Sequence, residues 1–129
     1  MNNEINSKIA RTFSQCVREI RTWETQNLPR SQSYIAFDLF ILLGHSAALD
    51  QPMTLKELFH SLRHSERGVR YVLDQFIDGG WCEIVGNEQD RRFRRVVATH
   101  LLRTRLREYE QYVLTVYRNF LPSVQSRDD

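Results

Sequence analysis

Residues 65–99 read SERGVRYVLDQFIDGGWCEIVGNEQDRRFRRVVAT, and this stretch decides the fold. Its first half predicts an amphipathic helix over about residues 65–79, because apolar side chains recur three or four positions apart and so share one face. Those side chains belong to Val69, Val72, Leu73, Phe76 and Ile77. Ser65 is a residue type that caps helix starts, and Gly79 with Gly80 is the type that ends helices in a left-handed turn.

The second half of this stretch predicts a basic β-hairpin. Residues 81–85 and 93–97 are β-prone, and the polar residues 86–90 between them form a hairpin-type connection. Arginine is dense here and just beyond, with seven guanidinium groups and no acid within residues 91–107: Arg91, Arg92, Arg94, Arg95, Arg103, Arg105 and Arg107. A merely solvated surface would mix both signs of charge, whereas arginine matches phosphate and guanine edges with two hydrogen bonds. A helix followed by a basic hairpin therefore favours DNA, with the helix in the major groove and the hairpin along the backbone.

A shorter helix upstream completes a helix-turn-helix. Residues 50–53 read as a turn, and Thr54 with Glu57 has the spacing of a capping box. The helix that follows is expected over about residues 55–62, with its leucines and phenylalanine facing inward. Gly68, in the next helix, costs about 1 kcal/mol in helix propensity relative to alanine, which a close approach of these two helix backbones would explain.

The composition bounds the rest of the molecule. With 129 residues, 41% of them hydrophobic, the chain predicts a single domain, residues 1–129, that is mainly α-helical with a small β-hairpin. Its longest apolar run predicts a buried central helix over about residues 33–48, since the run is shorter than the roughly 20 residues that span a bilayer. The first residues lack the order of a signal peptide, and two cysteines are too few for a disulfide framework. We therefore expect a cytoplasmic protein.

Long helices are expected at both ends of the chain, over about residues 3–26 and 99–121. Thr99 is placed to cap the second helix and Pro122 to stop it, which leaves residues 122–129 as a polar tail. Each helix carries a heptad seam of apolar residues, namely Ile9, Phe13, Cys16, Ile20 and Trp23 in the first and Leu102, Leu106, Tyr109, Val113, Val116 and Phe120 in the second. Because a lone helix cannot bury such a seam, we expect a two-fold dimer through these helices. The alternative is that the two helices pack on each other within one chain.

The resulting order, α-α-α-α-β-β-α, is that of a winged helix-turn-helix whose DNA-binding lobe spans residues 33–98. Over about residues 33–102 the sequence resembles the MarR family of winged-helix transcription regulators. The wing signature of that family, Asp-x-Arg and then a strand ending in Leu-Thr, is matched from Asp90 to Thr99, with Ala98 in place of the leucine. The recognition-helix pattern of the family is matched by Ser65, Val69, Val72, Leu73, Asp74, Gly80 and Trp81.

The resemblance implies two further features. Arg92 would enter the minor groove at the wing tip, with Asp90 pairing to its guanidinium. A small apolar or aromatic effector would bind between the dimerising helices and the DNA-binding lobe, and Tyr34, His45 and His100 are candidates for its polar contacts.

We therefore predict a dimeric, sequence-specific DNA-binding regulator of transcription that needs no cofactor and reads a near-palindromic operator. The predicted DNA contacts are Ser65, Glu66, Arg67, Arg70, Tyr71, Asn87, Asp90, Arg91, Arg92 and Arg94. The alternative is a winged-helix subunit that contacts another protein and does not bind DNA. An enzyme is not expected, because no nucleophile–base pair, glycine-rich phosphate loop or set of paired carboxylates stands out.

Two smaller features carry chemistry of their own. Cys16 is a candidate redox site, because the peroxide-sensing branch of the resembled family also places its reactive cysteine in the first helix. Its seam position, however, is more typical of a buried, inert thiol. His60 and His64 lie four residues apart, but no third metal ligand is evident beside them, so we interpret them as surface histidines.

Overall fold

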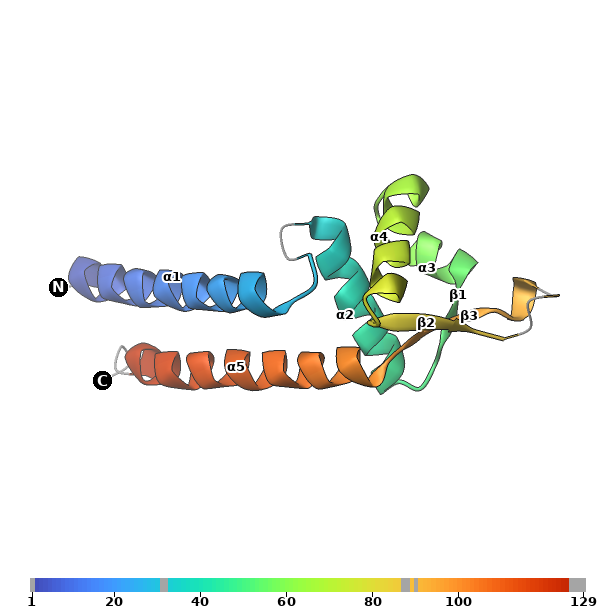
Figure 1. Cartoon of the computed structure of the whole chain (residues 1–129). Coiled ribbons are helices and arrows are strands. Elements are labelled where there is room, and N and C mark those ends of the chain that lie inside the picture. The colour runs from blue at the N-terminus through green and yellow to red at the C-terminus, as the bar shows by residue number, and fades with distance from the viewer. Residues whose placement is uncertain (1, 31–32, 87–88, 90, 126–129) are drawn as a thin grey trace. The chain divides into compact units, whose positions relative to one another are not determined.

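The computed structural model describes residues 2–30, 33–86, 89 and 91–125 (Figure 1). Its elements are, in chain order, α1 (Asn2–Asn27), α2 (Tyr34–Ala48), β1 (Met53–Thr54), α3 (Leu55–Ser61), α4 (Glu66–Asp78), β2 (Cys82–Val85), the 3-10 turn η1 (Arg91–Phe93), β3 (Arg95–Ala98) and α5 (His100–Gln125). They fall into two compact units, which we call the terminal unit (α1 with residues 107–125) and the central unit (Leu28–Leu106). Among the described residues, no helix is both long and apolar enough to cross a membrane.

All five expected helices are present, and the last one is longer than predicted. The sequence places the end of α5 at residue 121, whereas the helix continues through Pro122 to Gln125. Proline removes one backbone hydrogen bond and crowds the preceding turn. Pro122 therefore weakens the turn before it but does not end the helix at residue 121.

The sheet contains one strand more than the predicted hairpin. Its three strands are antiparallel in the order β1-β3-β2, so the predicted turn at residues 50–53 is wrong at its end, where Met53 pairs with Val96. The hairpin itself is confirmed, with Cys82 opposite Ala98. Its second strand begins at Arg95 rather than at residue 93, because η1 takes up the residues before it.

The loop of the hairpin begins at Gly86, directly after β2. This residue has φ +121°, and a Cβ atom there would lie 2.6 Å from the carbonyl oxygen of Phe93. Only glycine has no Cβ atom and reaches this conformation without strain. The hairpin loop therefore leaves β2 through a position where a side chain would be strained.

The core of the central unit is built around α2, as its apolar sequence predicts. Eleven of the buried side chains come from α2, α3, α4, the sheet and the start of α5: Ala36, Leu39, Phe40, Leu43, Leu58, Val69, Val72, Leu73, Phe76, Val96 and Leu102. The Phe40 ring meets the Trp81 ring edge to face, with centroids 6.3 Å apart. This core fixes α4 by its apolar stripe and leaves the opposite face of α4 in solvent.

Both predicted ends of α4 are confirmed. The Ser65 hydroxyl accepts a hydrogen bond from the Gly68 amide at 3.1 Å. At the other end Gly80 has φ +79°, and the Trp81 amide donates to the Phe76 carbonyl at 2.9 Å. This is the Schellman arrangement that a glycine after the last helical residue allows.

Gly68 is explained by a different neighbour from the one expected. A Cβ atom at this position would lie 2.9 Å from Cδ1 of Ile35 and 3.0 Å from the Ser65 hydroxyl oxygen. The restriction therefore comes from a side chain of α2 and from the helix's own cap, and the predicted approach of the α3 backbone is wrong.

Thr99 joins the end of α4 to the start of α5. Its hydroxyl donates to the Gly80 carbonyl at 2.6 Å, and its amide donates to the Trp81 carbonyl at 3.1 Å. The same hydroxyl accepts from the Leu102 amide at 3.5 Å, so its predicted role as a helix cap is confirmed.

The terminal unit is held together by residues of the two heptad seams, which contact each other within one chain. Its buried residues are Cys16, Ile20 and Val116, and the side chains around them belong to Tyr109, Tyr112, Val113 and Phe120. Trp23 stacks on Tyr109 and Tyr112, and Phe13 meets Phe120 with ring centroids 5.9 Å apart. For these residues the structure shows packing within one chain, and the expected dimer stays a prediction. Leu106 instead lies beside Gly44 in the central unit, and the side chain of Ile9 is outside the described part of the chain.

Candidate nucleic-acid interface

The outer face of α4 carries the residues that the sequence predicts to read DNA. Glu66, Arg67, Arg70 and Tyr71 are all exposed, and the Tyr71 side chain is 59% accessible. Ser65 stands at the start of this face, but its hydroxyl is engaged as the cap of the helix. Among the described residues Arg67 has no ion-pair partner, which leaves its guanidinium available to a base edge or a phosphate.

Arg70 is held in place on both sides. Its guanidinium forms an ion pair with Glu66 at 3.0 Å, and its Cζ atom lies 5.0 Å from the centroid of the Phe59 ring on α3. An exposed pair of this spacing stabilises a helix by only about 0.3–0.5 kcal/mol. A phosphate can therefore take the place of the Glu66 carboxylate while the stacking on Phe59 keeps the guanidinium positioned.

A basic hollow joins α3, α4 and the hairpin. Its volume is about 620 Å³, and it is lined by Thr54, Leu55, Lys56, Arg70, Arg92 and Arg94. Four of these six side chains are cationic, and none of the described residues that line it is acidic. Three of the four cations are among the predicted DNA contacts. The fourth, Lys56, is not, because it stands alone between an uncharged and an acidic neighbour in the sequence. We call this feature the basic hollow.

Arg95 belongs to the dense arginine run but is not among the predicted DNA contacts, and its side chain binds the hairpin turn. The Arg95 guanidinium donates to the carbonyl oxygens of Arg92 at 2.9 Å and Arg94 at 3.4 Å. Arg92 is exposed, with its Cζ atom 6.0 Å from the Phe93 ring centroid. Asn87 and Asp90 lie outside the described residues, so the expected pairing of Asp90 with Arg92 does too, and Arg91 is described only as backbone of η1.

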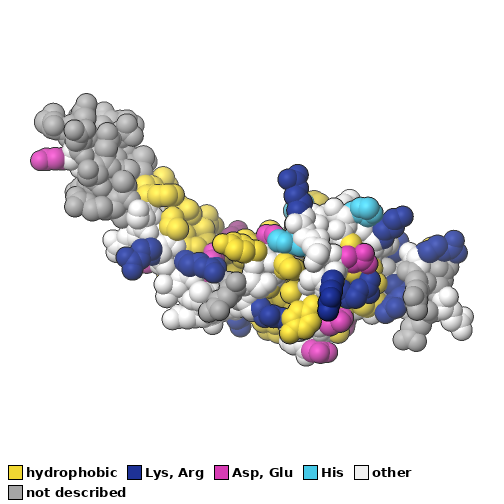
Figure 2. Space-filling model, turned by 90° about the horizontal axis from the view of Figure 1, so that it is seen from above, with side chains coloured by type: hydrophobic (Ala, Val, Ile, Leu, Met, Phe, Trp, Pro, Cys, Tyr) yellow, Lys and Arg dark blue, Asp and Glu magenta, His cyan; other side chains and the backbone are white. Residues whose placement is uncertain are grey.

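The remaining arginines of the dense run do not join this surface as one cluster. Arg105 stacks on the Trp81 ring, with its Cζ atom 5.6 Å from the ring centroid. Arg103 lines a separate hollow of about 60 Å³ with Ser46, and Arg107 belongs to the terminal unit. Figure 2 shows dark-blue Lys and Arg side chains over the central unit, interspersed with magenta acidic ones. The interface is therefore a local basic hollow rather than a uniformly basic face.

The candidate histidine and effector residues do not gather into a site. His64 Nε2 lies 2.6 Å from the Asp38 carboxylate, and within the described part of the chain no group of three ligands is placed to hold a metal ion. Tyr34, whose side chain is 85% accessible, and His45 stand near opposite ends of α2. His100 is exposed at the start of α5, 3.3 Å from the Thr104 hydroxyl.

Both cysteines are buried thiols. Burial, followed by the Glu19 carboxylate, raises the pKa of Cys16 above its ordinary value. Burial, followed by Glu83, raises the pKa of Cys82 to about 12. Since the thiolate is the reactive form, neither environment favours oxidation.

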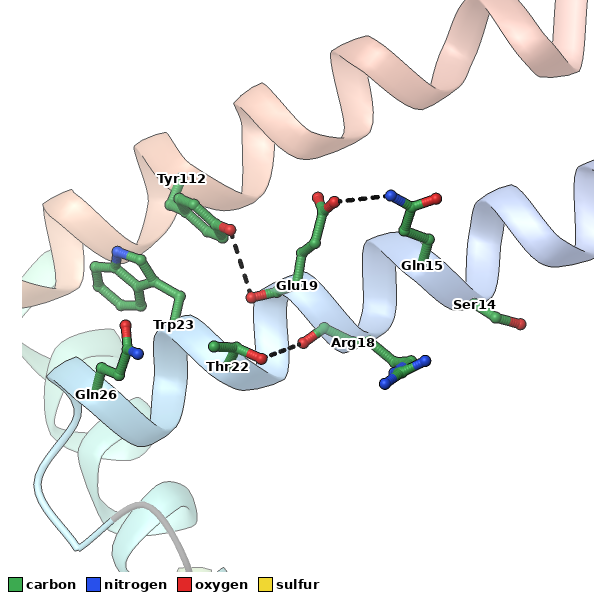
Figure 3. A pocket seen from close by; sticks show the side chains of 8 residues that line it. All are labelled: Ser14, Gln15, Arg18, Glu19, Thr22, Trp23, Gln26 and Tyr112. Atoms are coloured by element: carbon green, nitrogen blue, oxygen red, sulfur yellow. Dashed lines mark hydrogen bonds between the residues drawn. The ribbon is translucent and has the colours of Figure 1, made fainter.

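The terminal unit has an open hollow of its own, of about 940 Å³ (Figure 3). Trp23 and Tyr112 provide its aromatic side, and the polar side chains along α1 provide the rest: Ser14, Gln15, Arg18, Glu19, Thr22 and Gln26. Within it the Gln15 amide donates to Glu19, and the Tyr112 hydroxyl lies 3.4 Å from the Glu19 carbonyl.

Comparison with known proteins places the fold. No protein-family model matches the sequence, and no curated protein matches it. Among solved structures, the heme sensor protein PefR from Streptococcus agalactiae in complex with heme is 16% identical with TM-score 0.60, covering 95% of this chain and 85% of that chain. A mutant of MarR from E. coli complexed with operator DNA is 18% identical with TM-score 0.58, covering 91% of this chain and 79% of that chain. RV1404 from Mycobacterium tuberculosis is 13% identical with TM-score 0.64, covering 95% of this chain and 80% of that chain.

Proposed function

We propose that this chain, whose fold is the MarR-like winged helix, is a DNA-binding regulator of transcription. The observation that carries the proposal is the basic hollow, where cations from α3, α4 and the hairpin line one concavity beside the exposed face of α4. Cations from these three elements lie close enough together to bind an anion. The backbone of duplex DNA offers phosphates to all three elements at once.

In this proposal α4 enters the major groove. Arg67 and Tyr71 face base edges, and Glu66 accepts from cytosine when Arg70 turns to a phosphate. Arg92 and the turn around η1 follow the backbone or the minor groove. Arg95 serves the hairpin by holding its turn, through the two carbonyl contacts described above.

The proposal includes a two-fold dimer of terminal units. Besides the seam residues that pack within one chain, α5 exposes Leu114, Tyr117 and Leu121, which are spaced three and four residues apart. On α1 Phe13 and Val17 are also exposed. A contiguous apolar stripe on a helical hairpin is typical of an interface, and a second copy of the chain offers the same stripe in return.

The test is binding to DNA selected by the protein from a random pool, followed over a range of salt concentrations. With about three phosphates neutralised per subunit, the logarithm of the affinity falls against the logarithm of the salt concentration with a slope near −5. Arg92→Ala should weaken binding and flatten that slope, while Arg118→Ala, an exposed arginine of the terminal unit, should leave both unchanged. No binding to any duplex in dilute buffer would refute the proposal and favour the protein-interaction alternative.

We extend the proposal to a small-molecule effector. One solved structure of similar fold contains heme, a second is of BpsR from Bordetella bronchiseptica, whose DNA binding is regulated by 6-hydroxynicotinic acid, and a third is bound to ethidium bromide. The hollow of the terminal unit, with Trp23 and Tyr112 along one side, suits a planar molecule. In a Trp81→Phe variant, Trp23 is the one remaining tryptophan, so quenching of its fluorescence by these three compounds tests the site directly.

A further inference from the structure

A cation from outside the helix-turn-helix and the hairpin lies on the outer face of α4. The Cζ atom of Arg30 is 5.2 Å from the centroid of the Tyr71 ring. Arg30 belongs to the turn between α1 and α2, forty-one positions before Tyr71, and both side chains are exposed. Arg30 is not among the DNA contacts predicted from the sequence.

The backbone beneath Arg30 is held firmly to α2. Arg30 has φ +47°, a left-handed conformation, and the Ser33 amide closes the turn by donating to its carbonyl at 2.9 Å. The Ser33 hydroxyl then caps α2 by accepting from the Ala36 amide at 3.2 Å. Two residues on, Cδ1 of Ile35 lies 2.9 Å from the position of a Cβ atom on Gly68, so the first turns of α2 and α4 lie against each other. Arg30 is therefore presented to α4 by a fixed support.

Stacking determines which part of the guanidinium stays available. A guanidinium that lies over an aromatic ring uses its face, and its N–H edge remains free to bind an oxyanion. Among the described residues Arg30 has no ion-pair partner, so no carboxylate competes for that edge. Arg30 thus combines a backbone held by hydrogen bonds, an aromatic ring beneath its guanidinium, and a positive charge that no carboxylate of the described residues pairs with.

We propose that Arg30, positioned by the ring of Tyr71, binds a backbone phosphate at the border of the groove that α4 enters. This inference rests on the proposed DNA-binding function. Arg30 reaches α4 from a neighbouring element, so it lies beside the helix, where the phosphates border the groove, while Arg67 in the first turn faces the bases. The α1–α2 turn thereby adds a third anchoring point to α4 and the hairpin.

Salt-dependent binding of the full chain to two duplexes tests the contact, one selected from a random pool and one unrelated. Arg30→Ala should weaken binding to both by the same factor, about five- to tenfold, and reduce the salt slope by about 1 per subunit, the effect of one phosphate. Arg30→Lys keeps the charge and should keep the slope. A loss confined to the selected duplex, or a lysine variant with the slope of the alanine variant, would overturn the phosphate assignment.

A double-mutant cycle tests the role of Tyr71 as a positioning residue. Tyr71→Phe keeps the ring, so Arg30→Ala should have the same effect in that background as in the wild type. Tyr71→Leu removes the platform, so Arg30→Ala should then change the affinity by less than twofold. If the effects of Arg30→Ala and Tyr71→Leu on affinity simply multiply, the ring does not position the arginine and the inference fails.

Controls separate this inference from the function on which it rests. Arg118→Ala, which removes an exposed arginine from α5, should leave binding at the wild-type level. If Arg92→Ala is impaired and Arg30→Ala binds as the wild type does, the DNA-binding proposal stands and only the Arg30 contact is refuted. If the wild type binds neither duplex, the DNA-binding proposal itself fails. Thermal melting of each variant shows that the comparison is made between folded proteins.

Discussion

The hydroxyl of Tyr109 donates a 2.5 Å hydrogen bond to Oε2 of Glu24, and this bond joins two helices of the terminal unit whose partners stand 85 positions apart in the chain. The other carboxylate oxygen of Glu24 accepts from Arg21 at 3.1 Å. Trp23 stacks on the Tyr109 ring at 5.4 Å and 9°. A heptad seam that reads as purely apolar thus contains a polar bond with a single geometry, which aligns α1 and α5 in one register.

Tyr109→Phe should destabilise the chain by about 1 kcal/mol, because it leaves the half-buried Glu24 carboxylate without one donor. Urea unfolding measures the loss as a lower transition midpoint. Tyr112→Phe is the matched control, since its hydroxyl makes only a 3.4 Å contact with the Glu19 carbonyl, and it should cost much less. Equal losses from the two variants would show that the Glu24 bond has no special weight.

The same residue predicts a loss of stability at alkaline pH. Burial, then the hydrogen bond to Glu24, raises the pKa of Tyr109 above its ordinary value near 10. As the pH rises past 10, the unfolded chain releases this proton first, so the unfolded state is favoured and stability falls. The wild type should therefore lose more stability than Tyr109→Phe between about pH 9 and pH 11, a range centred on the ordinary pKa of tyrosine. Parallel losses in the two proteins would contradict the assignment.

Gly68 and Ile35 should show strong coupling. Alanine favours a helix over glycine by about 1 kcal/mol, but in the wild type its Cβ atom would lie 2.9 Å from Cδ1 of Ile35. Gly68→Ala alone should therefore bring no gain in the free energy of unfolding. After Ile35→Val removes that methyl group, the same substitution should stabilise the chain by up to about 1 kcal/mol. Ile41→Val, on the exposed side of α2, is the control background, and a gain there as well would refute the contact.

The central unit shows what the sequence could predict and what it could not. The ends of α4 depend on local chemistry, a serine before the helix and glycines after it, so they could be placed from residues 65–80 alone. Strand β1 has two residues, too few for any periodicity, and exists because Met53 finds Val96 across the sheet. Such a pairing depends on the whole fold, so no local sequence pattern predicts it.

The candidate interface shows the same division. Charge density located the basic hairpin, because charge is a property of composition. It could not tell that Arg95 binds the backbone carbonyls of Arg92 and Arg94, because that contact depends on how the hairpin loop folds. Nor could it tell that Arg105 lies over the Trp81 ring, because that partner is far away in the sequence. Isolated cations, Lys56 and Arg30, went unnoticed for the opposite reason. Each has few basic neighbours in the sequence, and only the folded chain brings Lys56 beside the other cations of the basic hollow and Arg30 over Tyr71.

Exchange of Leu114 for glutamate should prevent dimerisation. The substitution puts a charge at the first position of the exposed stripe on α5, where a partner would bury it without compensation. Light scattering coupled to gel filtration should show the molar mass of one chain for Leu114→Glu and of two chains for the wild type. Asn119→Glu, on the opposite side of the same helix, should remain dimeric. A monomeric wild type would refute the proposed dimer.

The two thiols should be inert while the chain is folded. Burial and the carboxylates nearby raise the pKa of Cys16 and Cys82, so a thiol-specific reagent should label them at neutral pH only after unfolding in urea. Peroxide should accordingly leave a protein–DNA complex intact. Release of DNA from the wild type but not from Cys16→Ser would establish Cys16 as a redox sensor after all.

The left-handed pivot at Gly86 limits how this molecule can diverge. Because a single added carbon would collide with the Phe93 carbonyl oxygen, the direction in which the hairpin loop leaves β2 cannot be adjusted by replacing that residue. Insertions or deletions at the tip remain open and change only how far the hairpin reaches. Related sequences can therefore vary the length of the hairpin loop, but those that keep its direction must keep glycine at this position.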